Sequence, residues 1–279
     1  MNYFLRFPEG KAKALTFSYD DGVVQDIRLI ELFQKYGLKG TFNINGNLFE
    51  QGEHLDAETV RNLYVPNGQE LACHGFNHPF LEKLPDNLAL YEITEDRRVL
   101  EAITGKIIRG MAYPYGTTSA RTKELLKAAG IAYARDIDET NQFGLPADWL
   151  QWKPTCHHNA PNIFDLAQDF LSRNMKSIGL VTNDGLLFYV WGHAYEFDRR
   201  DNWEHVEKLA QMVAGKADVW YATNMEIYRY ITAYRSLEFS MDHHLVYNPA
   251  TMDVWFAIRE NPYQQLKLVC VGAGETICL

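Results

Sequence analysis

The feature that most constrains the fold of this chain is a repeated alternation of short apolar segments with helical segments. The apolar segments have the length and residue types of β-strands, and the runs between them carry apolar residues at helical spacing. Predicted strands cover residues 14–19, 40–44, 70–73, 107–113, 131–135, 149–154, 186–192 and 219–223. Predicted helices cover residues 23–36, 57–63, 87–103, 119–129, 162–173, 203–213 and 225–234. This alternation is typical of β-α-β units, whose crossover helices make neighbouring strands parallel.

The number of predicted strands favours a barrel over an open sheet. Nearly all the candidate strands are separated by helices, as in (β/α) barrels of about 250 residues. We therefore predict an α/β fold with a distorted (β/α)7-8 barrel, and the pattern alone leaves an open sheet as the alternative. After residue 236 the pattern changes to β alternation in HLVYN, MDVWFAI and QLKLVCVGAG. We expect residues 1–236 to form the barrel and residues 237–279 to form a small β extension.

Composition and charge exclude several classes of protein. Hydrophobic residues make up 47% of the 279 residues and charged residues 23%, which excludes a disordered or a fibrous chain. The formal net charge of −9 argues against a nucleic-acid partner and against binding to an anionic membrane surface. The four cysteines form no CxxC pair, so the sequence indicates neither a disulfide framework nor a zinc finger.

The first residues of the chain lack the apolar segment of a signal peptide. No later stretch of about 20 apolar residues could span a membrane. We therefore expect a cytoplasmic location for the chain as given, although a trimmed secreted protein would have the same appearance. The sequence does not indicate an oligomeric state.

Polar residues that can act in catalysis or bind a metal ion lie at the ends of the predicted strands. Asp20 and Asp21 follow the first strand, His74 ends the third, His78 comes four residues later, and His193 follows the strand 186–192. In a parallel barrel the catalytic groups gather at the carboxyl ends of the strands. Two imidazoles and one carboxylate are a donor set that holds a divalent ion with a position open for water.

Each of these motifs also has a purely structural interpretation. The two aspartates can cap the helix that follows them, and HGFNH can be a polar loop. The run RGMAYPYG, residues 109–116, can be a surface arginine followed by a proline turn. His193 can be a buried histidine whose hydrogen bonds are satisfied.

The order of the motifs is more specific than any one of them. SYDDG, TFNIN, HGFNH, RGMAYPYG and a strand ending in WGH follow one another along the chain. In this order they resemble the polysaccharide deacetylase family, the NodB-homology domains of carbohydrate esterase family 4. The resemblance covers approximately residues 11–225.

The resemblance implies a distorted barrel, usually of seven strands, that removes acetyl groups from N-acetylated or O-acetylated saccharides with a divalent metal. By position in the motifs, Asp20 corresponds to the catalytic base. Asp21, His74 and His78 correspond to the metal ligands. Zinc suits this donor set, and cobalt or nickel also fits it.

The remaining motifs imply three further roles. Arg109 corresponds to the arginine that holds the base, and the backbone N–H of Tyr115 corresponds to the oxyanion donor. His193 corresponds to the acid that protonates the leaving group. The aromatic residues expected to line a sugar groove are Tyr113, Trp149, Trp191 and Tyr195.

Two departures from the family pattern leave parts of the site open. The first motif has a tyrosine where many members have phenylalanine, and the fourth motif, an Asp with a Trp, has no clear counterpart among Asp136, Asp148, Trp149 and Trp152. The partner of His193 and the roles of His157 and His158 therefore stay unassigned. Two other functions remain open: hydrolysis of another non-peptide C–N bond, and carbohydrate binding by an inactive barrel.

Overall fold

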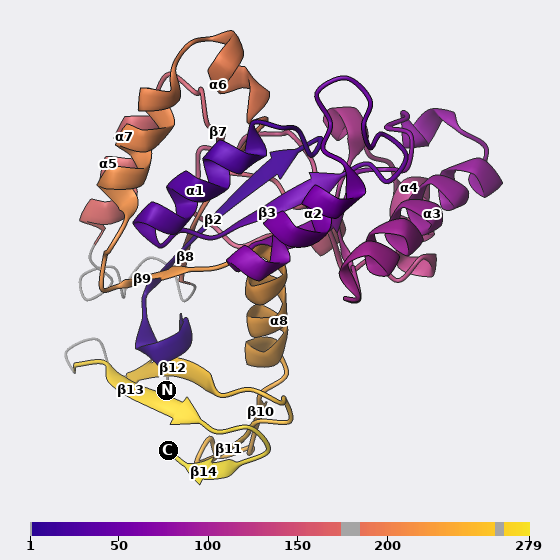
Figure 1. Cartoon of the computed structure of the whole chain (residues 1–279). Coiled ribbons are helices and arrows are strands. Elements are labelled where there is room, and N and C mark those ends of the chain that lie inside the picture. The colour runs from indigo at the N-terminus through magenta and orange to yellow at the C-terminus, as the bar shows by residue number, and fades with distance from the viewer. Residues whose placement is uncertain (1, 174–184, 260–264) are drawn as a thin grey trace.

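The computed structural model describes residues 2–173, 185–259 and 265–279, which form an α/β part and a smaller β part (Figure 1). The strands of the α/β part pair in parallel, in the order β6-β5-β4-β3-β2-β8-β7, and β9 pairs with the start of β2. These strands are β2 (Lys13–Asp20), β3 (Gly40–Ile44), β4 (Glu70–Cys73), β5 (Gly110–Ala112), β6 (Tyr133–Arg135), β7 (Cys156–His157), β8 (Leu186–Gly192) and β9 (Val219–Tyr221). The sheet is curled into a half-barrel, so the predicted α/β class and distorted barrel are confirmed.

Helices cover the sheet and connect its strands. They are α1 (Asp26–Tyr36), α2 (Ala57–Leu63), α3 (Asp86–Thr104), α4 (Ala120–Ala128), α5 (Ile163–Ser172), α6 (Tyr195–Arg199), α7 (Trp203–Val213) and α8 (Asn224–Arg235). Local sequence sets several of their ends. The Ser119 and Thr223 side chains form capping boxes at the starts of α4 and α8, and Gly37 takes the left-handed conformation that ends α1.

The two central strands explain why the sequence pattern is strong there. Every residue of β2 and of β8 is buried, because helices lie on both faces of the sheet. The sequence of β8 is accordingly an uninterrupted apolar run, and the parallel pairing of β2 and β8 brings Asp20 and Gly192 to the same edge of the sheet. This edge is where the candidate active site forms.

One predicted strand is wrong. Residues 149–154 do not form a strand: Trp149–Gln151 is a 3-10 turn (η5), which starts where the Asp148 side chain accepts a hydrogen bond from the Leu150 N–H. The strand at this place is the short β7, which starts two residues after the predicted segment ends. Trp152 makes only an isolated bridge, with Arg135.

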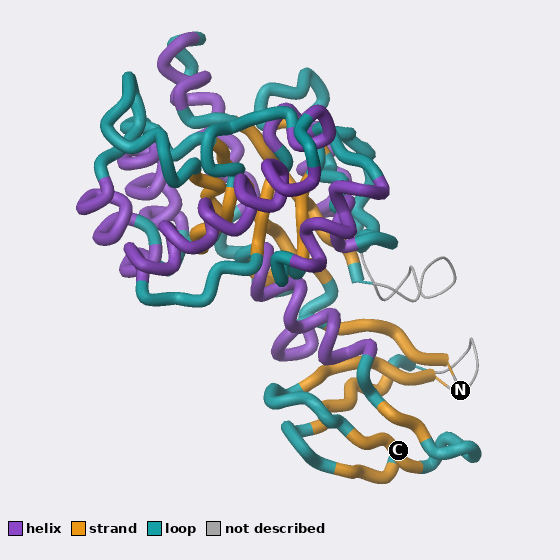
Figure 2. The backbone as a smooth tube through the Cα atoms, turned by 90° about the vertical axis from the view of Figure 1, so that its right-hand side faces the viewer, coloured by secondary structure: helices purple, strands orange, loops and turns teal. Residues whose placement is uncertain are grey.

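The β part consists of two antiparallel three-stranded sheets. Their orders are β1-β12-β13 and β10-β11-β14, with β1 (Asn2–Arg6), β10 (Glu238–Phe239), β11 (Leu245–Tyr247), β12 (Val254–Arg259), β13 (Lys267–Val271) and β14 (Thr276–Cys278). Both chain ends lie in this part, which α8 joins to the parallel sheet (Figures 1 and 2). The division at residue 236 stays a prediction, and β1 pairs with β12 across it.

None of the described helices combines the length and the hydropathy that crossing a membrane requires.

Candidate active site

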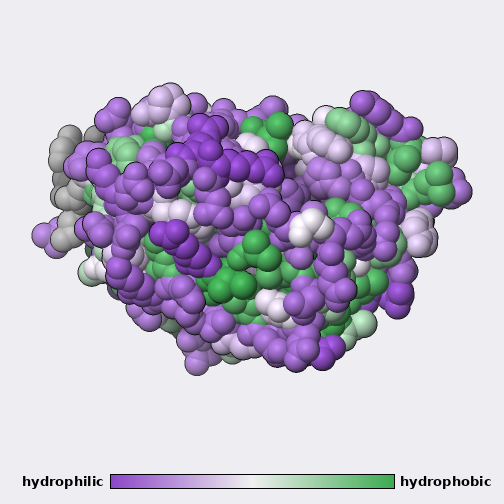
Figure 3. Space-filling model, turned by 45° about the horizontal axis from the view of Figure 1, so that its top comes forward, coloured by the Kyte–Doolittle hydropathy of each residue, from purple (hydrophilic) through white to green (hydrophobic). Residues whose placement is uncertain are grey.

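The carboxyl ends of the central strands surround a cavity of about 360 Å³. Its lining comes from segments far apart in the sequence and consists of Asp20, Asp21, His74, His78, Tyr113, Tyr115, Gly116, Ile137, Trp191, His193 and Tyr195. The surface at this end of the molecule is mostly hydrophilic, with patches of hydrophobic side chains between the polar ones (Figure 3). All but one of the residues predicted to act in catalysis or to bind the metal are in this lining, and the exception is Arg109.

Asp21, His74 and His78 place three potential metal-ligand atoms close together. The two Nε2 atoms of the histidines are 3.1 Å apart, and Asp21 Oδ1 lies 3.6 Å from His74 Nε2 and 3.8 Å from His78 Nε2. Ligand atoms that each sit about 2.0–2.2 Å from one zinc ion are roughly 3.0–3.5 Å apart, so the separations are close to those of a metal site.

Further contacts make these imidazoles suitable as metal ligands. His74 Nδ1 donates a hydrogen bond to the Ala112 carbonyl at 2.9 Å, which leaves the lone pair of Nε2 directed at the site. Burial, followed by the neighbouring His74, lowers the pKa of His78 to about 4, so His78 is neutral at pH 7. Asp21 and His78 both have positive φ, 81° and 55°, a conformation that is uncommon for non-glycine residues and is found at many active sites. The residues therefore fit a divalent ion.

Asp96 of α3 holds the backbone next to this group, and it was not among the predicted site residues. Its buried carboxylate accepts hydrogen bonds from the backbone N–H of His74 at 2.8 Å and from that of Gly46 at 2.6 Å. It thereby fixes the loop ends after β3 and β4. The available signal was a charged residue on the buried face of a predicted helix.

Asp20 is held by Arg135. The Arg135 Nη2 group donates to Asp20 Oδ1 at 2.6 Å and to Oδ2 at 2.5 Å, and Asn43 Nδ2 donates to Oδ1 at 2.8 Å. Burial raises the pKa of Asp20, but Arg135 and the imidazoles nearby outweigh burial and lower this pKa to about 2. Asp20 is therefore an ionised carboxylate at neutral pH.

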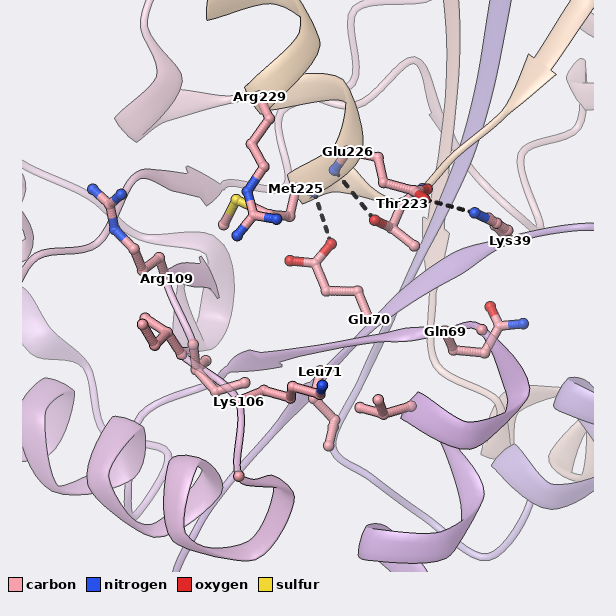
Figure 4. A pocket seen from close by; sticks show the side chains of 15 residues that line it. Lys39, Gln69, Glu70, Leu71, Lys106, Arg109, Thr223, Met225, Glu226 and Arg229 are labelled. Carbon is pink, nitrogen blue, oxygen red and sulfur yellow. Dashed lines mark hydrogen bonds and ion pairs between the residues drawn. The ribbon is translucent and has the colours of Figure 1, made fainter. Parts of the chain in front are cut away.

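The prediction that Arg109 holds the base is wrong. Arg109 is exposed, donates from Nε to the Gly130 carbonyl, and lines a different cavity (Figure 4). The physical reason is its place on the strand: Arg109 directly precedes β5, whereas Asp20 lies at the carboxyl end of β2. Arg135 ends β6, and the rule that selected the other residues, a polar residue at a strand end, would have found it.

Tyr115 lies at the mouth of the cavity. It has a positive φ of 59°, and its ring stacks on that of Phe80, with centroids 3.8 Å apart. The ring also meets His78 at a centroid distance of 4.5 Å. The backbone of Tyr115 is thus next to the candidate metal ligands, and its role as an oxyanion donor stays a prediction.

The partner of His193 is Glu196, one turn further on in α6. His193 Nδ1 donates to Glu196 Oε1 at 2.8 Å, while His193 Nε2 lies 3.9 Å from Asp20 Oδ2 and 4.0 Å from Asp21 Oδ2. Burial lowers the pKa of His193, but the hydrogen bond to Glu196 and the charge of Asp20 outweigh burial, so the pKa is raised overall. Glu196 thus holds His193 with Nε2 toward the cavity.

His157 and His158 lie behind Glu196 rather than in the cavity lining. The Asn159 N–H donates to His157 Nδ1 at 3.1 Å, so His157 Nε2 carries the proton that it donates to Glu196 Oε1, also at 3.1 Å. His158 is fully buried, and its Nε2 lies 3.6 Å from Glu196 Oε2. Although His157, His193 and Glu196 are close enough to share a cation, these hydrogen bonds account for their arrangement.

Three of the four aromatic residues expected to line a sugar groove are in the cavity wall: Tyr113, Trp191 and Tyr195. Trp149 is not among the residues that line the cavity, and it packs edge-on against Trp152 and Tyr228.

Comparisons with known proteins concern the family and the fold. Residues 8–134 match the model of the polysaccharide deacetylase family. A protein from Mycobacterium smegmatis assigned to the polysaccharide deacetylases has a similar structure, with a TM-score of 0.61 and 17% identity over 84% of this chain and 96% of that one. This likeness shows that the two chains share a fold. No curated protein sequence matches the chain.

Two further solved structures are more distant. A family 4 carbohydrate esterase from Streptomyces lividans, in complex with acetate, has a TM-score of 0.49 and 18% identity over 75% of this chain and 90% of that one. The Streptococcus pyogenes deacetylase PplD, in complex with acetate, has a TM-score of 0.45 and 18% identity over 49% of this chain. The matched part spans 61% of the length of PplD.

The resemblance to the polysaccharide deacetylase family is therefore confirmed, with a family match over residues 8–134 of the chain. The family match includes Asp20, Asp21, His74 and His78, and it ends one residue before Arg135.

Proposed function

We propose that this protein is a metal-dependent hydrolase that removes N-acetyl groups, with O-acetyl groups as a second class of substrate, from a saccharide. The observation that carries the proposal is the convergence of three groups in one cavity. Asp21, His74 and His78 form a ligand set. The ionised Asp20 lies beside it, with Oδ2 3.9 Å from His74 Nε2 and 3.9 Å from His193 Nε2. A base, a metal site and an acid in contact are what hydrolysis of an acetamide requires.

Asp21, His74 and His78 would hold the metal. Zinc suits two imidazoles and a carboxylate, and cobalt or nickel also fits them. When bound, such an ion lowers the pKa of a coordinated water and polarises the acetyl carbonyl.

Asp20 accepts the proton of the attacking water in this proposal. Its two hydrogen bonds from Arg135 hold the carboxylate in place, and its low pKa keeps it ionised before the reaction. Proton transfer by a positioned group contributes roughly 10²–10⁴-fold to a rate.

Tyr115 and His193 complete the reaction. The Tyr115 N–H donates to the oxygen that becomes negative, which stabilises the transition state by roughly 3–4 kcal/mol for a well-placed donor. His193 donates its Nε2 proton to the leaving nitrogen or oxygen. Glu196 accepts from His193 Nδ1 and so fixes which nitrogen faces the substrate.

The test is acetate release from N-acetylated chito-oligosaccharides and from O-acetylated xylan, after chelator treatment and again after zinc is restored. We expect activity that disappears with the chelator and returns with zinc. His74→Ala should stay inactive, whereas His244→Ala, at an exposed histidine of the β part, should behave as the wild type. Zinc-restored protein that releases no acetate but hydrolyses a small amide would contradict the proposal.

A further inference from the structure

A second cavity, of about 600 Å³, is shown in Figure 4. Its lining residues lie at the amino end of the parallel strands, whereas the candidate active site lies at their carboxyl end. The walls of this second cavity come from the starts of β4 and β5, the loop before β5, and the first turns of α8. This volume falls within the range of about 300–1,000 Å³ that is common for small-molecule sites.

The carboxylates of this cavity already have partners. Glu70 accepts hydrogen bonds from the Tyr133 hydroxyl at 2.7 Å, from the Thr41 hydroxyl at 2.8 Å and from the Met225 N–H at 2.8 Å. Glu226 is paired with Lys39 at 2.6 Å. The acidic side chains are therefore directed at groups of the protein itself.

The remaining cations of the lining have no such partner. Lys106, Arg109 and Arg229 make no ion pair within the part of the chain that the structure describes. Arg109 uses only Nε, toward the Gly130 carbonyl. In Figure 4, Arg229 extends from α8 toward Glu70, and Lys106 and Arg109 lie on the facing wall. A chain with a net charge of −9 thus gathers three unpaired cations around one cavity.

The rest of the wall is apolar and gives the cavity room for more than an inorganic ion. Val65 and Met225 contribute aliphatic and thioether surface beside the cations. Guanidinium groups bind phosphate and carboxylate with paired hydrogen bonds, and three cations match the charge of a phosphate dianion better than that of a single carboxylate.

We propose that this cavity binds an organic phosphate, with the phosphate group on Lys106, Arg109 and Arg229 and the organic part against Val65 and Met225. The proposal does not depend on the proposed deacetylase function, because none of these residues belongs to the candidate active site. Binding should need no metal and should persist in His74→Ala.

The experiment is isothermal titration calorimetry with phenyl phosphate, inorganic phosphate and benzoate at one fixed ionic strength. We expect phenyl phosphate to bind more tightly than the other two. Loss of one charged hydrogen-bonding group lowers affinity about tenfold, so Arg109→Ala and Arg229→Ala should each weaken phenyl phosphate binding by about this factor. Arg98→Ala is the matched control, because Arg98 is exposed on α3, outside the cavity, and paired with Glu95.

Three results would overturn the proposal: no heat of binding for phenyl phosphate, equal affinity in Arg109→Ala, Arg229→Ala and Arg98→Ala, or benzoate binding as tightly as phenyl phosphate. The last result would assign the cavity to carboxylates. Circular dichroism of each variant establishes that a loss of binding comes from the missing guanidinium and not from unfolding.

Discussion

Arg135 donates two hydrogen bonds to the carboxylate of Asp20, at 2.6 and 2.5 Å, although the residues are 115 positions apart. Both side chains are almost completely buried, with exposed fractions of 1% and 3%. The pair joins β2 to β6 at the carboxyl edge of the sheet, with Asn43 as a third donor to the aspartate. The ionised state of the candidate base therefore depends on an arginine that lies outside the family motifs.

Arg135→Met should destabilise the fold, because it leaves a buried carboxylate without its cation. Breaking a buried pair in this way costs about 3–5 kcal/mol of unfolding free energy, whereas an exposed residue such as Arg109 contributes within about 0.5 kcal/mol. Urea unfolding at pH 7 of the wild type, Arg135→Met and Arg109→Ala measures the difference. Equal losses in the two variants would contradict the assignment.

The same pair predicts how stability changes with pH. The pKa of Asp20 in the folded state, about 2, is below the value of roughly 3.9 in an unfolded chain. Its stabilising contribution is therefore present above pH 4 and is lost as the pH falls through 2. The difference in unfolding free energy between the wild type and Arg135→Met should therefore be smaller when urea unfolding is repeated near pH 3. A gap that does not change would show that Asp20 titrates normally.

Asp20→Asn should abolish turnover and spare metal binding. The amide cannot accept the proton of the attacking water, and the expected loss is about 10²–10⁴-fold in kcat. Asp21, His74 and His78 keep their places, so the zinc content should not change. Acetate release and elemental mass spectrometry on the same sample give both values. An Asp20→Asn variant with activity near that of the wild type would show that the base is another residue.

Glu196→Gln should slow reactions that need a proton on the leaving group. The amide keeps the size of the side chain but removes the charge that favours a protonated His193, and we expect a fall in kcat of about 10²-fold on an N-acetyl sugar. Hydrolysis of 4-nitrophenyl acetate, whose leaving group needs no proton, should fall much less. Equal losses on both substrates, or a loss of zinc, would indicate a structural role for Glu196.

The buried carboxylate of Asp26 should make the stability of the fold depend on pH in the opposite direction. Its carboxylate is fully buried, and only Oδ2 has a hydrogen bond in the described residues, from the Tyr64 hydroxyl at 2.7 Å. Burial raises its pKa to about 8, above the unfolded value, so its contribution to stability is present below pH 4 and is lost as the pH rises toward 8.

Asp26→Asn should therefore gain stability relative to the wild type between pH 6 and pH 8, by up to about 1.4 kcal/mol per pH unit. Urea unfolding at the two pH values measures this change. Asp165→Asn, at an exposed aspartate of α5, should show no such gain. A wild type and Asp26→Asn whose difference is the same at both pH values would contradict the raised pKa.

The strands that were predicted well are those whose burial imposes a local pattern. Every residue of β3 and of β8 is buried, and both strands have the predicted bounds, Gly40–Ile44 and Leu186–Gly192. β1 was missed because its partner is β12, at the other end of the chain, and five residues carry no signal of so distant a pairing. β7 has two residues, too few for any periodicity.

The site residues differ in the same way: some could be predicted from their position at a strand end, and others could not. Asp20, Asp21, His74 and His193 follow strands and could be predicted from that position. The role of Arg109 was taken from its place in the motif RGMAYPYG, but the structure places this arginine in front of β5 and away from Asp20. Arg135 ends a predicted strand, but the sequence does not show that its side chain reaches Asp20, 115 residues away. Glu196 lies only three residues after His193, and the motifs gave it no role.

The most direct test of the central claim, that Asp21, His74 and His78 form a metal site, is the metal content of the protein. Wild type, His74→Ala and His244→Ala are incubated with zinc, desalted and measured by elemental mass spectrometry. We predict about one equivalent of zinc in the wild type and in His244→Ala, and little in His74→Ala. Wild-type protein without bound zinc, or His74→Ala with as much zinc as the wild type, would contradict the account.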